Sequence, residues 1–416
     1  MKLYDIAVVG AGPAGMMAAI RAGQLDKNVI IIEKNDILGK KLKITGSSRC
    51  NITNTASFDI FMEKFGKRGS FFRSAFSTFS SKRLMTFFKA KGLKFKIEDN
   101  GRVFPVTDKS RSVIKVLKEY LSENKVIRNY NTRLINIKNK KEYFSLDLGN
   151  DNYVATRSII LATGGVSYKA TGSTGDGLDI AQKMGHSIKP LKPGLVPLKL
   201  SDTWVKELQG ISLENIQIKI KYGKKNIISN NGNLIFTHFG ISGPLVLDYS
   251  NQIISILEKN ESMQFFIDLK PEMTIQELEE KLIKEFEIRR KSEFKNFMKF
   301  LLPNRMIPVF IELLGMNAKK KVNQIEKEER NSIINLLKAF PLTIIDSMGV
   351  NKAMITCGGI SRSEINPQTL ESKLIKNLYF AGEIIEGCAS SGGYNLQQAF
   401  STGYLAGEAA AKQIIE

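Results

Sequence analysis

The sequence has few of the residues that most often build metal sites and disulfide scaffolds. Its 416 residues include three cysteines, two histidines and one tryptophan. Cys50, Cys357 and Cys388 are far apart and form no C-x-x-C pair, so we expect no disulfide framework, dithiol redox centre or zinc site. His186 and His238 are too few for histidine-rich chemistry, and we predict no metal. This cysteine use is typical of a reducing cytoplasm, where we expect the protein to reside.

Long apolar runs are also scarce. Residues 6–20, IAVVGAGPAGMMAAI, are uncharged and follow Lys2, as in a signal peptide, but three glycines and Pro13 interrupt the run. No other run reaches the roughly 20 apolar residues that a membrane span needs. We therefore expect no membrane partner.

Acidic residues are outnumbered, with 41 Asp and Glu against 61 Lys and Arg, a net charge of +20. Such an excess can indicate a nucleic-acid partner. The lysines are scattered, however, and clusters such as 138–141 and 318–330 are short or mixed with acids, which favours a general surface composition instead. The content of 43% hydrophobic and 25% charged residues is that of a globular protein, and the length suggests two or three domains. Nothing in the sequence predicts the oligomeric state.

The N-terminal segment has the pattern of a dinucleotide-binding βαβ unit. An apolar strand in YDIAVVGAGPAG leads into G-x-G-x-x-G at Gly10, Gly12 and Gly15, a helical pattern follows, and NVIIIEK (28–34) is a second strand ending at Glu33. The glycines permit a tight turn, close approach of a pyrophosphate, and close packing of helix on strand. The diphosphate would lie at the helix N-terminus and Glu33 at the ribose hydroxyls, which disfavours a 2′-phosphate. We assign Ala14 and Lys34 to the same site.

Two later strands complete this pattern. SIILATGG (158–165) ends in Thr163, Gly164 and a further glycine, and NLYFAGE (377–383) ends in Gly382 and Glu383. Together with the N-terminal unit they resemble the FAD-binding domain of the glutathione-reductase-like flavoproteins. In that superfamily the late acid, here Glu383, hydrogen-bonds the ribityl chain.

Four longer blocks narrow the resemblance. They are GKKLKITGSSRCNITN (39–54), FTHFGISGP (236–244), CGGISRSEI (357–365) and YFAGEIIEGCASSGGYNLQQA (379–399). From about residue 3 to 410 the chain resembles the BaiN-type flavoproteins, also labelled aminoacetone-oxidase-like or NAD(P)/FAD-dependent oxidoreductases. The resemblance implies non-covalent FAD and an α/β fold: a Rossmann-like FAD-binding domain with an inserted β-barrel-like substrate domain and a nested α-helical subdomain. Because few members have known substrates, it implies the cofactor better than the reaction.

Further cofactor contacts are expected mainly from this resemblance. Lys40 and Arg49 would reach phosphates, and Asn51 the flavin or ribityl chain. Leu134, in NTRLINIKN (131–139), would contact adenine unless this is a plain edge strand. Thr163 and Gly164 would pass near the adenosine or diphosphate. Asp176, in TGSTGDG (171–177), would be a turn residue or a ribityl-side contact. For Cys50 we favour a small buried apolar residue over a redox role.

The stretch SSGGYNLQQAFSTGYLAG (390–407) carries little acid–base chemistry but begins a helix with a glycine pair. We expect Gly392 and Gly393 to allow close backbone approach, and Asn395 and Leu396 to lie in the first helical turn. A helix N-terminus favours negative charge, so this turn would stabilise the anionic pyrimidine end of reduced flavin. Small residues farther along, from Ala399 to Gly407, would let the helix pack closely.

Two side chains are candidate catalytic residues. His238, in FTHFGISGP, is either a proton donor near the flavin or a satisfied core histidine. Tyr394, beside the turn expected to face the flavin, would stack or donate a proton. His186 follows a helical pattern and is interpreted as structural.

The dinucleotide motifs divide the chain. We predict a discontinuous FAD-binding domain at 1–195 and 345–416, a β-rich substrate domain at 196–272 and about 341–344, and a helical subdomain at 273–340. Residues 196–270 are expected to be mostly strands, since NIQIKIKY (215–222) alternates strictly. Thr274 is a candidate N-cap for the first helix of the subdomain.

Three functions stay open. The first is an FAD-dependent oxidoreductase that transfers hydride at the flavin to or from a small organic substrate, an enone among the candidates. A second G-x-G-x-x-G is absent, so NAD(P)H would bind only transiently. The second is an amine oxidase that uses oxygen. The third, of another class and motivated by the +20 charge, is a flavin-containing nucleic-acid-binding or RNA-modifying protein.

Overall fold

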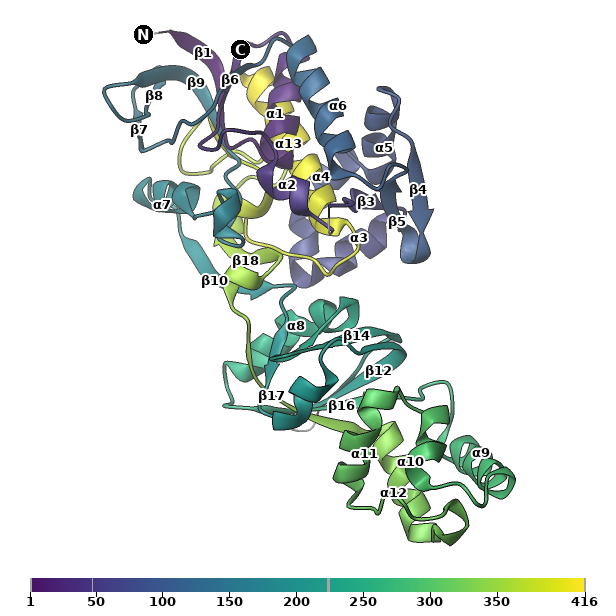
Figure 1. Ribbon diagram of the computed structural model, residues 1–416. Coiled ribbons are helices and arrows are strands. Elements are labelled where there is room, and N and C mark those ends of the chain that lie inside the picture. The colour runs from purple at the N-terminus through teal and green to yellow at the C-terminus, as the bar shows by residue number, and fades with distance from the viewer. Residues whose placement is uncertain (1, 47, 223–224, 415–416) are drawn as a thin grey trace. The chain divides into compact units, whose positions relative to one another are not determined.

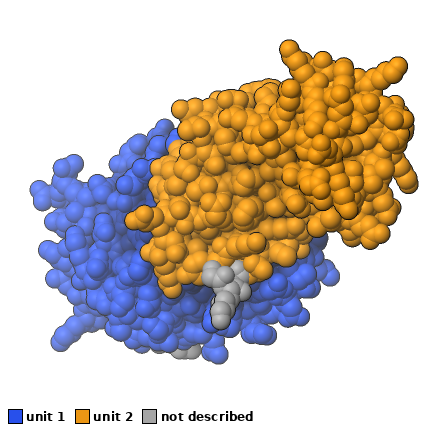
Figure 2. Space-filling view, turned by 90° about the horizontal axis from the view of Figure 1, so that it is seen from below, with its two compact units in different colours: residues 1–194, 350–416 blue, residues 195–349 orange. Residues whose placement is uncertain are grey.

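The computed structural model describes residues 2–46, 48–222 and 225–414. The chain divides into two compact units, residues 1–194 with 350–416 and residues 195–349 (Figure 2, blue and orange). The first unit therefore contains both ends of the chain, and the second is inserted between them.

A seven-stranded sheet organises the first unit. Its order is β6-β2-β1-β9-β8-β7, with β19 also paired to β9. The strands β6, β2, β1, β9 and β19 run parallel, whereas β8 and β7 form an antiparallel extension. The bounds are β1 Leu3–Val9, β2 Val29–Ile32, β6 Ile127–Asn129, β7 Asn136–Asn139, β8 Phe144–Asp147, β9 Tyr153–Leu161 and β19 Leu378–Phe380. The continuous apolar runs that predicted β1, β2 and β9 are those of strands buried on both faces.

Two helices from opposite ends of the chain pack on each other. Helix α1 (Pro13–Gly23) lies beside α13 (Tyr394–Gln413) (Figure 1, purple and yellow). A Cβ atom on Gly403 would lie 2.2 Å from the Ala14 carbonyl oxygen, and one on Gly407 would lie 2.3 Å from that of Ala18. The small residues of α13 therefore allow backbone contact with α1, which brings the two terminal motifs together.

Smaller elements surround this sheet. A three-stranded antiparallel sheet, β3-β5-β4, lies in the same unit, and strands β10 and β18 form an antiparallel pair. The bounds are α2 Lys40–Ile44, β3 Thr53–Asn54, α3 Phe58–Lys64, α4 Arg73–Thr78, α5 Ser81–Lys89, β4 Phe95–Glu98, β5 Arg102–Pro105, α6 Ser110–Glu123, α7 Asp176–Lys183, β10 Ile188–Gly194 and β18 Ile355–Ile360.

The second unit contains a closed antiparallel barrel. Strands β12, β14, β15, β11, β17 and β16 pair in that order, and the β12–β16 pairing closes the ring, with β13 hydrogen-bonded to β12. The bounds are β11 Leu198–Leu200, β12 Ser212–Tyr222, β13 Lys225–Ile228, β14 Gly232–Thr237, β15 Gly240–Ser242, β16 Met263–Asp268 and β17 Phe340–Ser347. As the alternation predicted, Ile216, Ile218 and Ile220 on β12 are buried.

One expectation for this unit is wrong. Residues 196–270 were expected to be mostly strands, but α8 occupies Pro244–Leu257. Gly243, at φ +98°, turns the chain and Pro244 occupies the first helical turn, where its missing N–H costs nothing. The buried Leu245, Val246 and Ile253 then fix the helix against the barrel core.

The helical subdomain follows β16. Its helices are α9 Ile275–Ile288, α10 Phe294–Phe297, α11 Ile307–Leu314 and α12 Lys327–Lys338. Thr274 is the N-cap of α9, and with Glu277 it forms a reciprocal capping box. Leu278, Leu282 and Phe286 form the buried face of α9, as their helical spacing predicted.

Among the described residues, no helix is long and apolar enough to cross a membrane. Over the same residues, no group of three or more histidine, cysteine, aspartate or glutamate side chains is placed to hold a metal ion.

Candidate active site

The glycines of the G-x-G-x-x-G loop have three different environments. Gly10 has φ +97°, and a Cβ there would lie 2.6 Å from the Ala162 carbonyl oxygen. A Cβ on Gly15 would lie 1.9 Å from the Gly10 carbonyl oxygen, so this glycine lets helix and loop touch. Around Gly12, by contrast, no atom lies within 4 Å of the Cβ position. The loop is therefore closely packed behind and open at Gly12, at the N-terminus of α1, as a diphosphate requires.

Glu33 follows β2 directly and is buried. Its carboxylate accepts hydrogen bonds from the backbone N–H of Ala11 at 2.7 Å and from the backbone N–H and side-chain amide of Asn35 at 2.8 and 2.7 Å. The acid is thus held against the glycine loop, where ribose hydroxyls are expected. Lys40 donates to the Asn35 side chain at 3.2 Å, and its contact with a phosphate stays a prediction.

Asp176 forms an ionic cluster with Lys34 and Arg133. Lys34 Nζ lies 2.9 Å from one carboxylate oxygen, Arg133 donates from two nitrogens at 3.0 and 2.8 Å, and the Thr174 hydroxyl donates at 2.7 Å. Burial raises the pKa of Asp176, but the hydrogen bonds from Lys34, Thr174 and Arg133 outweigh it and lower the pKa to about 2. Asp176 thereby ties the start of α7 to the segment after β2, and its role in cofactor contact stays a prediction.

Other predicted contacts lie around this region. Thr163 and Gly164 follow β9, and the Thr163 hydroxyl is buried without a hydrogen-bond partner among the described residues. Gly164 has φ +75°. Leu134 is buried just before the edge strand β7 rather than within it. Their adenosine contacts stay predictions.

The late acid, Glu383, follows Gly382 and lies at the meeting point of three segments. Its carboxylate accepts from Lys41 Nζ at 3.0 and 3.3 Å, from the Ser167 hydroxyl at 3.2 Å and from the Thr356 backbone N–H at 2.7 Å. The Thr356 hydroxyl in turn accepts from the backbone N–H of Ser167 at 3.1 Å. Sequence reasoning did not select Lys41, Ser167 or Thr356. Lys41 stands beside Lys40 in GKKLK, and only the rotation of the short helix α2 decides which lysine faces the acid.

The glycine pair before α13 has the conformation that its sequence indicated. Gly392 and Gly393 have φ +115° and +94°, and Gly393 is the N-cap of α13. A Cβ on Gly393 would lie 2.4 Å from the Thr53 carbonyl oxygen and 2.9 Å from Asn51 Oδ1. Asn51 Oδ1 is itself buried without a hydrogen-bond partner among the described residues. This atom beside the turn is the kind of unsatisfied group that a polar cofactor edge would engage.

Asn395 and Leu396 lie in the first turn of α13, as expected. The Asn395 side chain, however, accepts from the Ala389 N–H at 2.9 Å and donates to the Ala389 and Ser390 carbonyl oxygens at 3.0 and 3.3 Å. It therefore fixes the loop before the glycine pair, and only its backbone remains available for the expected role.

Arg49 and Cys50 are accounted for by local structure. Arg49 forms ion pairs with Glu98 and Asp108, and its guanidinium lies 4.2 Å from the centre of the Phe104 ring. Side-chain hydrogen bonds to those two acids raise its pKa. Cys50 is fully buried, which raises the thiol pKa to about 12 and makes it a poor nucleophile, as favoured from the sequence.

The two candidate catalytic residues lie in different units. Tyr394 is buried in the first unit, with its ring edge-on to Phe61 at a centroid distance of 4.9 Å. His238 is exposed in the second unit, between β14 and β15, with its ring edge-on to Phe239. The catalytic roles of both stay predictions. His186 is buried and its ring hydrogen-bonds the Ser372 hydroxyl at 2.8 Å, the structural role expected of it.

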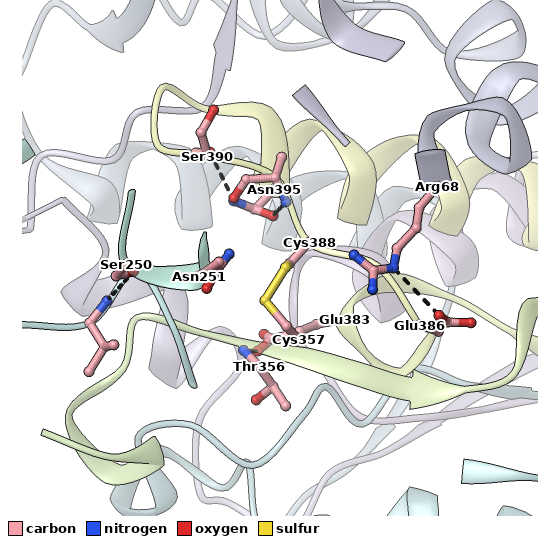
Figure 3. The surroundings of a disulfide bond; sticks show 12 residues. Arg68, Ser250, Asn251, Thr356, Cys357, Glu383, Glu386, Cys388, Ser390 and Asn395 are labelled. Carbon is pink, nitrogen blue, oxygen red and sulfur yellow. Dashed lines mark hydrogen bonds and ion pairs between the residues drawn. A yellow bond between two sulfur atoms is a disulfide. The ribbon is translucent and has the colours of Figure 1, made fainter. Parts of the chain in front are cut away.

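The expectation that the cysteines carry no disulfide is wrong. Cys357 on β18 is bonded to Cys388, 31 residues later. Figure 3 shows this disulfide with Thr356 and Glu383 near Cys357, and with Asn395 and Ser390 on the side of Cys388. The sequence did not reveal this pair because the two cysteines are far apart along the chain. The fold brings them together, since β18 lies beside the loop after Glu383, where Ile360 and Ile385 form a β-bridge.

Comparisons with known proteins agree with this geometry. The sequence model of the HI0933-like protein Rossmann domain matches residues 4–409. The chain belongs to the HI0933-like family. It is 30% identical over 410 residues to a 3-dehydro-bile acid delta(4,6)-reductase of Clostridium scindens, covering 98% of this chain and 99% of that protein. It is 27% identical over 415 residues to a ribosomal RNA dihydrouridine synthase of Escherichia coli, covering 97% of both.

Solved structures share the fold of this HI0933-like protein. A flavocytochrome c3 fumarate reductase aligns with a TM-score of 0.54 at 15% identity, over 100% of this chain and 79% of that one. A 3-ketosteroid-delta4-(5alpha)-dehydrogenase of Rhodococcus jostii aligns with a TM-score of 0.52 at 15% identity, over 99% and 97%. Both the family and the fold agree with the resemblance inferred from the motifs.

The residues present fit FAD. The open position at Gly12, the buried acid Glu33 and the unpartnered Asn51 Oδ1 beside Gly393 are all in the first unit. This HI0933-like protein is an FAD-dependent oxidoreductase.

Proposed function

We propose that the protein reduces a carbon–carbon double bond conjugated to a carbonyl group. Two relatives aligned over nearly their whole length are named for such reactions: one reduces a 3-dehydro-bile acid at delta(4,6), and the other produces dihydrouridine. In both cases the double bond is polarised by a carbonyl group, so a hydride can add to one carbon and a proton to the other. When FAD is bound and has been reduced by an electron donor, its flavin supplies the hydride.

The observation that carries the proposal is the turn at Gly392 and Gly393. Both glycines have left-handed conformations at the N-terminus of α13, and the first turn of this helix has no acidic side chain. A helix N-terminus of this kind stabilises the negative charge of a reduced flavin. Because a reduced flavin donates hydride, the turn favours hydride transfer. Tyr394, directly after the pair, is our candidate proton donor to the substrate.

Two substrate classes remain under this reaction. A small enone is the first, in line with the bile-acid reductase relative. A uridine of RNA is the second, favoured by the dihydrouridine synthase relatives and by the net charge of +20. We propose NAD(P)H as a transient electron donor. The proposed cytoplasmic location loses one support, because it was argued from unpaired cysteines.

The test uses FAD-loaded protein under anaerobic conditions. NADH or NADPH should bleach the flavin absorbance, and an added 3-oxo-4-ene steroid or a uridine-containing RNA should restore it. A saturated 3-oxo steroid and an RNA without uridine are the matched controls. If neither unsaturated substrate restores the flavin absorbance and only oxygen does, the proposal is refuted. Bleaching of the flavin by amines would favour the oxidase alternative.

A further inference from the structure

A polar pocket lies in the first unit, outside the glycine-loop cradle. It is a largely open depression with a volume of about 530 Å³. Lys189 and Arg362 line it together with three hydroxyl side chains, Ser70, Ser361 and Ser363. Phe71 and Pro367 are its apolar lining residues. A steroid would need mainly apolar walls, so this lining indicates an anionic, hydrogen-bonding ligand instead.

The pocket belongs to a motif that the cofactor site leaves unexplained. Ser361, Arg362 and Ser363 are the centre of the block CGGISRSEI and follow β18 directly. The hydroxyls of Ser361 and Ser363 lie 2.9 Å apart and hydrogen-bond each other. One of the two hydroxyls donates this hydrogen bond, and the other keeps its proton available for an oxygen-rich ligand.

The walls of the pocket are held in place by three contacts. The Glu386 backbone N–H donates to the Ile360 carbonyl oxygen at 3.0 Å, and Ile360 forms a β-bridge with Ile385. On the other side, a Cβ on Gly387 would lie 2.9 Å from the Phe72 ring, so the loop packs against the segment Gly66–Phe72 that carries Ser70. A site with walls this fixed loses little entropy when a ligand binds.

Positive charge exceeds negative charge here. Glu386 accepts from Arg68 Nε at 3.4 Å and from Arg362 Nε at 3.3 Å, so one carboxylate is shared by two guanidinium groups (Figure 3 shows Arg68 and Glu386). Among the residues that line the pocket, the balance is two cations, Lys189 and Arg362, against one carboxylate, Glu386, or 2 − 1 = +1. The Glu364 carboxylate is bound by the Ser187 backbone N–H and does not line the pocket.

We propose that this pocket binds a phosphate group of a nucleotide ligand other than the FAD held by the glycine loop. Arg362 contacts Glu386 only through Nε, which leaves the paired terminal nitrogens of its guanidinium to face a phosphate. Serine hydroxyls and Lys189 complete the usual donor set for this group. The phosphate belongs either to NADPH or to an RNA backbone, and the inference holds whether or not the proposed double-bond reduction is correct.

The test measures binding to oxidised, FAD-loaded protein by calorimetry, without turnover. The probes are NADPH, NADH, inorganic pyrophosphate and a short single-stranded oligouridylate. Arg362→Gln removes the guanidinium, and Ser363→Ala removes one hydroxyl. Lys118→Gln, on the exposed face of α6, removes the same unit of charge elsewhere and is the matched control.

We expect Arg362→Gln to weaken binding of at least one phosphate probe about tenfold and Ser363→Ala to weaken it several-fold, while Lys118→Gln changes neither. A loss confined to NADPH, with NADH unaffected, identifies the dinucleotide as the source; a loss confined to oligouridylate identifies RNA. FAD content and thermal stability, which should match wild type, show that the variants are folded. The inference is overturned if every probe binds Arg362→Gln as tightly as wild type, or if none binds wild type at millimolar concentration. The flavin-bleaching assay tests the proposed reaction separately.

Discussion

The disulfide between Cys357 and Cys388 gives a stability prediction with a number attached. Both cysteines are in the first unit, and the bond closes a loop with a sequence separation of 31 residues. In the chain-entropy treatment, a loop of this length restricts the unfolded chain by about 12 cal/mol/K, or about 3.7 kcal/mol at 25 °C. Replacing both cysteines by serine should therefore destabilise the first unit by up to about 3.7 kcal/mol.

Cys50 provides the assay. It is the one free cysteine among the described residues, it is fully buried, and the chain has three cysteines in all. In wild type and in the double serine variant alike, Cys50 is then the single thiol, and its alkylation reports unfolding of the first unit without interference from the second. With a urea slope of about 3 kcal/mol/M, the midpoint of Cys50 labelling should fall by roughly 1 M in the variant.

The reductant control decides whether the bond causes the change. A dithiol reductant, added and then removed before unfolding, should lower the wild-type midpoint to that of the variant and leave the variant unchanged; alkylation is read at Cys50 itself, because reduced wild type has three thiols. Equal midpoints for oxidised wild type and the variant would show that the cross-link does not stabilise this unit. Three reactive thiols in unfolded protein that has met no reductant would show that the bond does not form.

Three further predictions concern the cradle. Gly12→Ala should fold normally yet weaken FAD binding at least tenfold, because its methyl group enters the open space. Gly15→Ala should instead destabilise the first unit by about 3 kcal/mol. Equal FAD affinity in Gly12→Ala and wild type would refute the assignment of a phosphate to the space at Gly12. Lys41→Met should weaken FAD binding about tenfold and Lys40→Met little, since only Lys41 contacts Glu383, and fluorescence titration of FAD compares the two. Because the pKa of Asp176 is lowered to about 2, Asp176→Asn should lower the free energy of unfolding by about 1 kcal/mol above pH 4. This difference should disappear as the pH falls toward 2. A difference in urea unfolding that stays constant across this range would contradict the ion-pair account.

The sequence was most informative where chemistry and local geometry coincide. In the first βαβ unit, Gly10 needs a left-handed turn and Gly15 a close backbone approach, and no other residue satisfies either without strain. The strict alternation of Ile216 to Ile220 likewise predicted β12, because only a half-buried strand has that period. The length and order of the motif blocks also carried the family, the FAD cofactor and the inserted barrel.

Tertiary packing decided the hydrogen-bond partners of adjacent residues of the same type. Lys40 and Lys41 are equivalent in sequence, but the rotation of α2 directs one to Asn35 and the other to Glu383. In the same way, the asparagine of the first turn of α13 proved to brace its own loop.

The sequence by itself determined the nucleotide-binding loop, the strands β1, β2, β9, β19, β12 and β16, and the glycine start of α13. Each follows from constraints within a few residues: backbone conformation, burial period and the first turn of a helix. The disulfide, the partners of Glu383 and the polar pocket at Arg362 were decided only by the tertiary structure, because each joins segments from 24 to more than 300 residues apart. No local pattern records which distant side chains the fold brings within a hydrogen bond or a covalent bond of one another.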